Sequence, residues 1–354
     1  ILRSGDLTSR SGTAADKEAM LKGSRFHRKI QKQMGSTYQA EVPLKKESEY
    51  EDLILCVEGR ADGIFTENEA VCIDEIKGIY KSLDSLEGPV PIHRAQALCY
   101  GWIYMESHDL ERIDIQMTYG QLDTEEIRRF RETVTRGELE KWYQNLMDEY
   151  HKWASYQLAW RKERNASMET LEFPFPYRKG QREMVAGVYH AISEEEQIFI
   201  QAPTGIGKTM SAIFPAVRAV GQGKGEKVFY LTARTITRTV AEDAFSILRG
   251  KGLHFKSITI TAKEKMCFCD EMDCDPQKCP YAKGHYDRIN DAVYELWTKE
   301  EAFDRETILA QAEKYSVCPF EMTLDLAVWM DGIVCDYNYV FDPNVYLKRF
   351  FGEN

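Results

Sequence analysis

Residues 201–209, with the sequence QAPTGIGKT, constrain the fold of this chain more than any other stretch. The apolar run 198–200 before them predicts a buried strand, and residues 210–219 after them predict a helix that continues through Pro215. A glycine-rich turn between a strand and a helix presents backbone N–H groups and the positive end of the helix dipole to an anion. This order therefore predicts a phosphate-binding loop in an α/β domain.

Two side chains of this loop supply the groups that a nucleoside triphosphate requires. Lys208 is expected to reach the β- and γ-phosphates, and the Thr209 hydroxyl is expected to bind Mg²⁺. The alternative is a glycine-rich turn that contains Lys-Thr by coincidence, and the flanking strand and helix argue against it. Ala202 replaces the first glycine of the usual GxxxxGK[ST] pattern. The nucleotide-binding residues predicted here are Ala202, Pro203, Thr204, Gly205, Ile206, Gly207, Lys208 and Thr209.

Length and composition indicate the class of protein. The 354 residues exceed one typical domain, so we expect two or three. A hydrophobic content of 43% and a charged content of 29% are typical of soluble globular proteins, and no apolar run has the length of a membrane span. The net charge of -11 argues against a uniformly basic nucleic-acid binder, although it leaves room for a local basic groove.

The cysteines indicate the compartment and a possible metal site. Nine cysteines in a chain without a signal-peptide pattern favour a reducing, cytoplasmic environment, with metal-bound or free thiols in place of disulfides. Cys56, Cys72 and Cys99 are scattered singly, and we assign no metal to them. The other six crowd into the last quarter of the chain: Cys267, Cys269, Cys274, Cys279, Cys318 and Cys335.

The first third of the chain predicts a sheet with helices. Apolar spacing predicts a helix over residues 14–34, strands over 38–44, 53–57, 59–65 and 70–76, and a helix over 94–105. Asp62 and Glu75 then lie on adjacent strands, and Glu75 and Lys77 project from one face because they are two residues apart. Carboxylates that hold Mg²⁺ beside an ammonium group are what a metal-dependent hydrolytic site requires.

These residues occur in a recognisable order. Over about the first 120 residues, the order resembles the motif set of the RecB-family PD-(D/E)xK nucleases. The motifs are His27, Asp62 within Gly-Arg-Ala-Asp, Glu75-x-Lys77 and Gln96-x-x-x-Tyr100. The resemblance implies a nuclease-like domain over residues 1–122. In it, His27, Asp62 and Glu75 would hold Mg²⁺ or Mn²⁺, Lys77 would be catalytic, and Gln96 and Tyr100 would shape the site and touch DNA. The alternative is a nuclease-like fold whose acidic strand pair is merely solvated.

A helical connector is expected over residues 123–170. Between residues 123 and 164 the pattern predicts a long amphipathic helix with an aromatic stripe, for which a packing face is favoured over a base-stacking platform. The stripe consists of Trp142, Tyr143, Leu146, Tyr150, Trp153 and Leu158. Residues 165–176, which include Phe-Pro-Phe-Pro, break the pattern and mark a domain boundary.

Beyond that boundary, the run 227–235 predicts a strand that ends in Thr-Ala-Arg-Thr. This end of the strand is suited to bind a DNA phosphate backbone, because it places two hydroxyls and a guanidinium at one sheet edge. These groups belong to Thr232, Arg234 and Thr235. An ordinary strand end is the alternative. The cysteines that follow are soft ligands for zinc or for an iron–sulfur cluster. Because the spacing lacks paired CxxC knuckles, it favours iron–sulfur only slightly.

From residue 177 onward, the chain resembles the XPD/DinG family of iron–sulfur DNA helicases, because four motifs occur in the order that this family has. They are the phosphate-binding loop, the Thr-Ala-Arg-Thr strand, the cysteines ending in Cys-Pro-Phe-Glu and the run 331–343 (DGIVCDYNYVFDP). The resemblance implies a RecA-like, parallel-sheet motor domain over 171–354 with an iron–sulfur insertion over 263–322. Arg178 and Gln181 would recognise the adenine of ATP. The [4Fe–4S] ligands would be Cys267, Cys274, Cys279 and Cys318, with Cys269 an extra thiol and Cys335 buried in a strand.

The family couples ATP hydrolysis to 5′–3′ movement on single-stranded or forked DNA, so DNA repair or replication is the expected role. The family's Asp-Glu-Ala-His box does not occur in this sequence, so we expect weak ATP turnover and an N-terminal portion of a longer nuclease–helicase. The alternative function is a non-catalytic module that binds DNA and senses nucleotide, with a zinc-stabilised cysteine cluster and an inactive nuclease-like domain.

Overall fold

The computed structural model describes residues 2–7, 15–233, 235–343 and 345–351, without the side chains of residues 15–20, 235 and 236. The chain forms two compact units. Unit 1 is built mainly from residues 15–155, and unit 2 contains residues 156–351 together with residues 5–7. Among the described helices, none combines the length and the apolar character of a membrane span.

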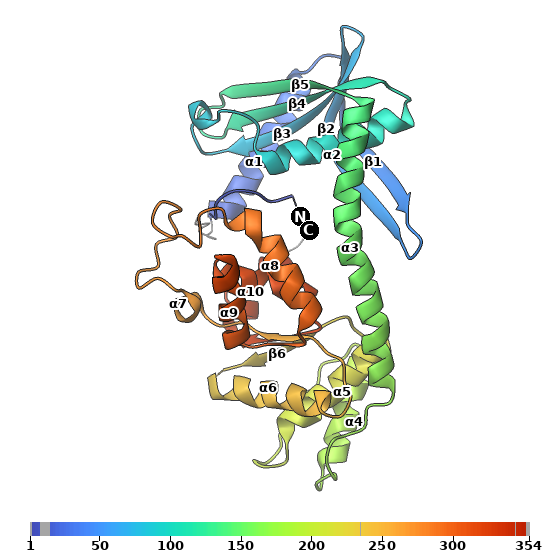
Figure 1. Ribbon diagram of the computed structural model, residues 1–354, viewed down its shortest axis with the longest axis vertical. Helices are drawn as coiled ribbons and strands as arrows, with labels where there is room; N and C mark the ends of the chain where they lie inside the picture. Colours follow the sequence, from blue (N-terminus) through green and yellow to red (C-terminus); the bar gives the residue numbers. More distant parts are fainter. Residues whose placement is uncertain (1, 8–14, 234, 344, 352–354) are drawn as a thin grey trace. The chain divides into compact units, whose positions relative to one another are not determined.

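Unit 1 is a five-stranded sheet with the strand order β1-β2-β3-β4-β5 (Figure 1). The pair β3–β4 is parallel and the other pairs are antiparallel. A parallel pair needs a crossover connection, which α2 provides. In chain order the elements are α1 Ala15–Gln33, β1 Gln39–Glu49, β2 Ile54–Glu67, β3 Ala70–Ile79, η1 Leu83–Ser85, α2 Pro91–Ser107, β4 Arg112–Gln121 and β5 Ile127–Thr135. The two strands expected at 53–57 and 59–65 are therefore one continuous strand, β2.

The two long helices of unit 1 cover opposite faces of the sheet. Phe26 and Ile30 of α1 pack against Ile76 of β3. Lys77, the next residue of β3, instead contacts Gln96 of α2. Because successive residues of a strand point to opposite faces, α1 and α2 lie on different sides of β3. The strand between them is buried on both faces, as its apolar composition requires.

The helical connector begins later than expected. Residues 127–135 form the edge strand β5, because their alternating exposure matches the two-residue period of a strand. The helix that follows, α3, spans Arg136–Glu169, and the boundary between the two units falls inside it, at Ser155–Tyr156. Tyr143 and Trp153 of the aromatic stripe are buried, which agrees with a packing face, whereas Tyr150 is 42% exposed.

Unit 2 contains a four-stranded parallel sheet with the order β6-β9-β7-β8. This sheet confirms the expected α/β class with parallel strands. The strands are β6 Val228–Thr232, β7 Ser257–Thr259, β8 Ala302–Phe303 and β9 Gly332–Asp336. The helices are α4 Gln181–Ser193, α5 Lys208–Gly221, α6 Thr235–Arg249, α7 Lys263–Met266, α8 His285–Lys299, α9 Arg305–Tyr315, α10 Pro319–Trp329, α11 Asn338–Phe341 and α12 Lys348–Phe351.

The strand predicted at residues 198–200 is wrong. This segment has no regular secondary structure, and Phe199 is 94% exposed. Among the described strands, none pairs with it. A strand without a neighbour leaves its backbone N–H and C=O groups without ladder partners, so apolar character alone does not create one. The helix predicted after the loop does form, as α5, with Pro215 inside it.

A buried carboxylate ties α3 to the sheet of unit 2. Asp331 lies just before β9 and is 4% exposed. Its oxygens accept hydrogen bonds from Arg164 Nη1 at 2.6 Å, from Trp160 Nε1 at 2.8 Å and from the Lys256 backbone N–H at 2.9 Å. Buried polar groups are tolerated when they are paired in this way. The cluster therefore joins the last turns of α3 to the starts of β7 and β9.

Candidate functional site

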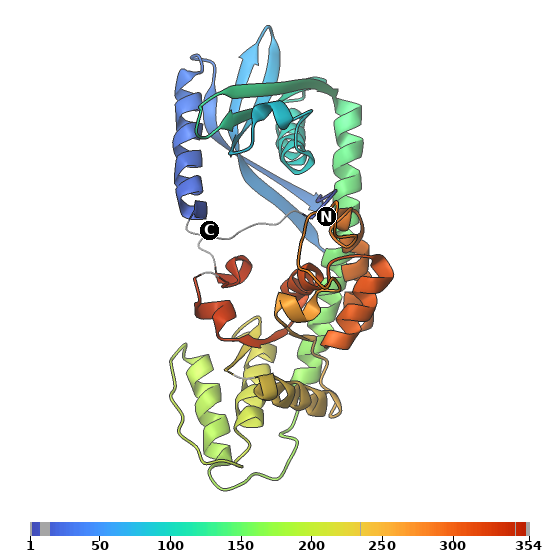
Figure 2. The ribbon, with the colours of Figure 1, turned by 90° about the vertical axis from the view of Figure 1, so that its left-hand side faces the viewer.

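Two strands of unit 1 separate at Asp62. β2 pairs with β3 only from Gly63 onward, while its first half continues beside β1 as a two-stranded ribbon (Figure 1, Figure 2). At the point of separation, Asp62 Oδ2 accepts a hydrogen bond from the Ile76 backbone N–H at 2.7 Å. Asp62 Oδ1 lies 3.5 Å from His27 Nδ1 of α1. The separation therefore lets residues from α1 and β2 meet at β3.

A chain of hydrogen bonds runs from β3 to α2. Lys77 Nζ donates to Glu75 Oε1 at 2.6 Å and to Gln96 Oε1 at 3.1 Å. Gln96 Nε2 in turn donates to Tyr100 OH at 3.2 Å. The four-residue spacing places Gln96 and Tyr100 on one face of α2. The structure thus brings together all six residues that the motif order singled out, although the motifs are up to 73 residues apart in sequence (Tyr100 minus His27).

Glu75 is the most deeply buried acid of this group. Its side chain is 1% exposed, and Oε2 has no hydrogen-bond partner. Burial raises the pKa of the Glu75 carboxyl to about 7, the Asp62 carboxylate adds to this increase, and Lys77 and His27 oppose it. A buried carboxylate oxygen without a donor costs free energy unless a cation or a proton neutralises it. Perturbed acids of this kind are concentrated at functional sites.

The motif glycine Gly59 allows α2 to approach the sheet. A Cβ atom added at Gly59 would lie 2.6 Å from Tyr100 OH, which is closer than real Cβ contacts. Any larger residue would push the Tyr100 ring away from β2 and disturb its hydrogen bond with Gln96. The close packing of Tyr100 therefore explains why position 59 is a glycine, independently of any role of Asp62.

The donor set of this site suits a divalent cation. Carboxylate oxygens and an imidazole are ligands for Mg²⁺ or Mn²⁺, and Glu75 Oε2 is a buried acceptor that lacks a donor. Across the part of the chain that the structure describes, no group of three or more His, Cys, Asp or Glu side chains is arranged to hold a metal ion. His27, Asp62 and Glu75 would therefore have to adjust their side chains to bind one.

The predicted phosphate-binding loop ends at the N-terminus of α5. Gly205 and Gly207 have φ angles of 88° and 84°, in the left-handed region that glycine adopts at little cost. Gly207 is the N-cap residue of the fourteen-residue helix α5. Thr204 and Ile206 lie in the same turn. Backbone N–H groups of the first helical turn lack partners inside the helix, so this end of α5 is suited to bind phosphate.

Lys208 and Thr209 lie at the start of this helix. The Lys208 ammonium folds back onto the loop, where it donates to the carbonyl oxygens of Ala202 at 2.9 Å and Pro203 at 3.4 Å. The Thr209 hydroxyl accepts a hydrogen bond from Tyr230 OH of β6 at 3.2 Å. Because Lys208 is exposed, its ammonium can exchange the carbonyls for phosphate oxygens without moving the helix.

Arg178 and Gln181 both contact the loop. Gln181 is 3% exposed, and its Oε1 accepts a hydrogen bond from the Arg178 backbone N–H at 3.0 Å. A Cβ atom at Gly207 would lie 2.7 Å from Gln181 Nε2, so this amide packs directly on the loop backbone. The Arg178 guanidinium donates to the Gly205 carbonyl. These contacts couple the start of α4 to the nucleotide-binding loop, and recognition of adenine stays a prediction.

At the carboxyl ends of β6 and β9, an ion pair appears that the sequence analysis missed. Thr232 is 3% exposed, and its hydroxyl donates to Asp336 Oδ1 at 3.4 Å. Arg238 Nε of α6 donates to the same carboxylate at 3.0 Å. Thr232 thus orients Asp336 instead of presenting its hydroxyl to solvent. Arg234 and the Thr235 side chain lie outside the described residues. The available signal was the position of Asp336 at a parallel strand end, where functional groups gather.

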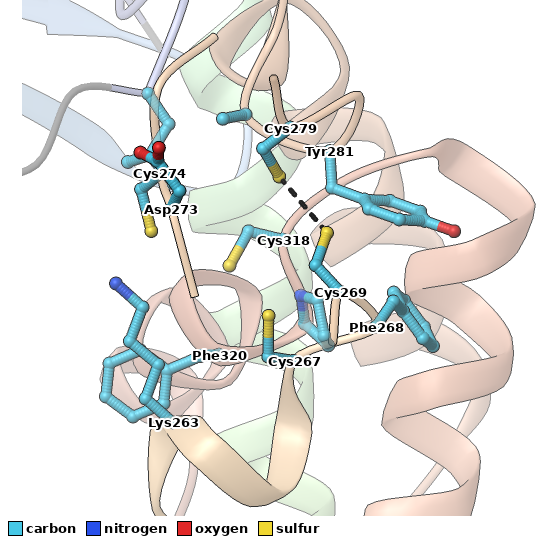
Figure 3. A pocket seen from close by; sticks show the side chains of 13 residues that line it. Lys263, Cys267, Phe268, Cys269, Asp273, Cys274, Cys279, Tyr281, Cys318 and Phe320 are labelled. Atoms are coloured by element: carbon cyan, nitrogen blue, oxygen red, sulfur yellow. Dashed lines mark hydrogen bonds between the residues drawn. The ribbon is translucent and has the colours of Figure 1, made fainter. Parts of the chain in front are cut away.

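Five cysteines of unit 2 line one cavity. Figure 3 shows their sulfur atoms directed into a common space between the 267–279 loop and the start of α10. Cys269 Sγ lies 3.9 Å from Cys279 Sγ. The five are Cys267, Cys269, Cys274, Cys279 and Cys318, which include all four residues that the resemblance implies as ligands. Cys335 is fully buried in β9, as expected.

Two comparisons with known protein families concern unit 2. Residues 178–294 match the DEAD/DEAH box helicase family, and residues 253–349 match the DEAD_2 family. Unit 2 is therefore similar to helicase domains over most of its length. The chain is also similar to the regulator of telomere elongation helicase 1 homolog of Caenorhabditis briggsae, with 21% identity over 221 residues. These matches support a helicase of the XPD type.

The similarity is partial. The aligned region covers 51% of this chain and 22% of the Caenorhabditis briggsae protein, so the chain spans about a fifth of the length of that relative. A solved structure described as "Crystal structure of SSO0001" is similar over 37% of this chain and 59% of its own chain, with 19% identity and a TM-score of 0.27.

Proposed function

We propose that this chain is part of an ATP-dependent 5′–3′ DNA helicase of the XPD type that carries a metal-dependent DNA nuclease domain and acts in DNA repair or replication. The motor part is supported by the two helicase-family matches over unit 2. The loop at the N-terminus of α5, with Lys208 and Thr209, would bind the phosphates of ATP and its Mg²⁺. The substrate would be single-stranded or forked DNA.

The nuclease part is supported by the single cluster around Glu75. His27, Asp62 and Glu75 would hold Mg²⁺ or Mn²⁺, which supplies Lewis-acid activation of a phosphate and of water when bound. Lys77 donates to one oxygen of Glu75, and the other oxygen is buried without a hydrogen-bond partner. Gln96 fixes the Lys77 ammonium from the side of α2. The lysine is therefore placed to stabilise negative charge on a phosphate or to orient a water molecule beside the carboxylates.

The cysteine cavity is supported as an iron–sulfur site by its donor set. Five thiols from two separate segments line it, and thiolates are the usual ligands of such clusters. Cys267, Cys274, Cys279 and Cys318 would hold a [4Fe–4S] cluster, and Cys269 would be a fifth, non-ligating thiol.

The nuclease is tested with the purified protein, Mn²⁺ and end-labelled forked DNA. Glu75→Gln should lower the cleavage rate by at least about 100-fold, because the neutral amide lacks the negative charge that binds the cation and pairs with Lys77. Glu51→Gln, in the exposed turn between β1 and β2, is the matched control and should cleave like the natural protein. Cleavage that survives Glu75→Gln would place the activity elsewhere.

The motor is tested by ATP hydrolysis with and without single-stranded DNA. We expect a low basal rate that single-stranded DNA increases more than duplex DNA does, and that Lys208→Ala removes. A rate that is indifferent to DNA and unchanged by Lys208→Ala would contradict the helicase proposal.

The cluster is tested by analysis of metal and sulfide. Iron and inorganic sulfide, with brown colour, are expected in the natural protein and in the control Cys56→Ser, whose cysteine is exposed in β2. Cys279→Ser should lose both, and Cys269→Ser should retain both. One zinc per chain, no sulfide and no cleavage of DNA would instead favour the second candidate, a zinc-stabilised module that binds DNA and senses nucleotide.

A further inference from the structure

The ladder between β1 and β2 is interrupted opposite Asp62. The strands keep one register from Gln39↔Ile64 to Glu49↔Ile54, and the pair that would join Glu41 to Asp62 is missing from it. Glu41 has a φ angle of 56°, in the left-handed region that non-glycine residues rarely adopt. Strained backbone of this kind persists only where surrounding contacts hold it, and it is concentrated at functional sites.

One side chain of α1 holds this interruption. Gln31 Nε2 donates to Glu41 Oε1 at 2.9 Å and to the Asp62 carbonyl oxygen at 2.9 Å, which uses both hydrogens of its amide. Gln31 lies four residues after His27, so both side chains project from one face of α1. This face therefore contacts Asp62 twice, through its carbonyl by Gln31 and through its carboxylate by His27.

The interruption changes what Asp62 can do. Its carbonyl oxygen accepts a hydrogen bond from Gln31 of α1. Its carboxylate reaches β3, where it accepts a hydrogen bond from the Ile76 backbone N–H at 2.7 Å. Distorted ladders beside active sites often redirect a side chain in this way.

From these contacts we infer that Gln31 and Glu41 are positioning residues, which hold Asp62 in the orientation that a divalent cation requires. The inference rests on the proposed nuclease function. Neither residue touches the reacting atoms. Gln31 acts through its hydrogen bond to the Asp62 backbone carbonyl. Glu41 acts as the second acceptor of the Gln31 amide, at the position where the ladder pair with Asp62 is missing.

Titration of the whole chain with Mn²⁺ alone, followed by calorimetry, tests this inference. Gln31→Ala should weaken Mn²⁺ binding by about 10- to 100-fold, the usual effect of removing a group that orients a metal ligand. Gln33→Ala is the matched control, because Gln33 lies on the same helix, is exposed and makes none of these contacts. In DNA cleavage, Gln31→Ala should lower kcat and leave the KM for DNA unchanged.

Two variants at Glu41 test whether Gln31 needs the hydrogen-bond acceptor that the Glu41 side chain provides. Glu41→Gln keeps an acceptor for Gln31 and should bind Mn²⁺ within about threefold of the natural protein. Glu41→Ala removes the acceptor, so its loss should match that of Gln31→Ala. If Gln31→Ala fails to fold, Gln31→Met, which fills the same space without a donor, takes its place.

The outcomes distinguish the two proposals. If the natural protein binds no Mn²⁺, or if Glu75→Gln binds it equally well, the nuclease site itself is wrong and the inference falls with it. If Glu75→Gln abolishes binding while Gln31→Ala and Glu41→Ala bind like the control, only the positioning role is overturned.

Discussion

The Lys77 ammonium donates to Glu75 Oε1 at 2.6 Å. The two residues are two positions apart in β3, so their side chains lie on one face of the strand. Glu75 is buried and its second oxygen has no donor, so Lys77 is the cation that directly neutralises it. The same ammonium is held by Gln96 from α2. Stability and chemistry at this site therefore depend on one pair of charges.

Removing the cation of this pair should destabilise unit 1. At pH 8, Lys77→Met leaves the Glu75 carboxylate buried without a counter-ion, and we expect a loss of about 2 kcal/mol in the free energy of unfolding. The double variant Lys77→Met/Glu75→Gln should recover most of this loss, yet neither variant should cleave DNA. Urea unfolding followed by circular dichroism measures both. A double variant as unstable as the single one would show that the pair is not the cause.

The phosphate-binding loop makes a different prediction, because Lys208 is exposed. Lys208→Ala should weaken binding of a fluorescent ATP analogue by about 100-fold, since the ammonium contributes a charge-assisted hydrogen bond to phosphate. The free energy of unfolding without nucleotide should change by less than about 0.5 kcal/mol. Lys224→Ala, an exposed lysine after α5, is the control for general loss of charge. Equal affinity in the two variants would argue against this loop as the ATP site.

The buried Asp331 should be essential for the stability of unit 2. Asp331→Ala removes the carboxylate that pairs with Arg164, and it leaves Arg164 Nη1, Trp160 Nε1 and the Lys256 backbone N–H without this acceptor. Loss of one partner from a buried ion pair typically costs about 3–5 kcal/mol. Chemical unfolding followed by tryptophan fluorescence reads this directly. Glu313→Ala, an exposed acid of α9, should have little effect, and a similar loss in both variants would contradict the prediction.

Lys256 should make the stability of the chain depend on pH in the alkaline range. Burial lowers the pKa of Lys256 to about 8 from an ordinary value of 10.5, and Glu301 and Asp331 oppose this decrease. Between these values the unfolded chain binds a proton that the folded chain does not, so the unfolding free energy rises with pH. Relative to Lys256→Met, the natural protein should gain up to about 1.4 kcal/mol per pH unit above pH 8. Unfolding curves at pH 7 and pH 9.5 measure this, and a constant difference between the proteins would refute it.

Much of the local structure was predictable because it depends on neighbours in sequence. The helix around His27 and the helix after Lys208 require only a regular backbone and one apolar face that can be buried. The motif order also singled out His27, Asp62, Glu75, Lys77, Gln96 and Tyr100, which lie together in unit 1. Cys335 was likewise predictable, because it lies inside a short apolar strand.

Other features depended on partners far away in sequence. Residues 198–200 have the composition of a strand, but a strand exists only where another strand accepts its backbone hydrogen bonds, and periodicity carries no information about that partner. Residues 127–135 became β5 because β4 offered them an edge.

The site itself shows the same division. Residue types and spacing indicated which groups would supply the chemistry around Glu75. Only the tertiary structure revealed that β2 and β3 separate at Asp62, and that Gln31 donates hydrogen bonds to Glu41 and to the Asp62 carbonyl oxygen, because these contacts join residues that no local pattern relates.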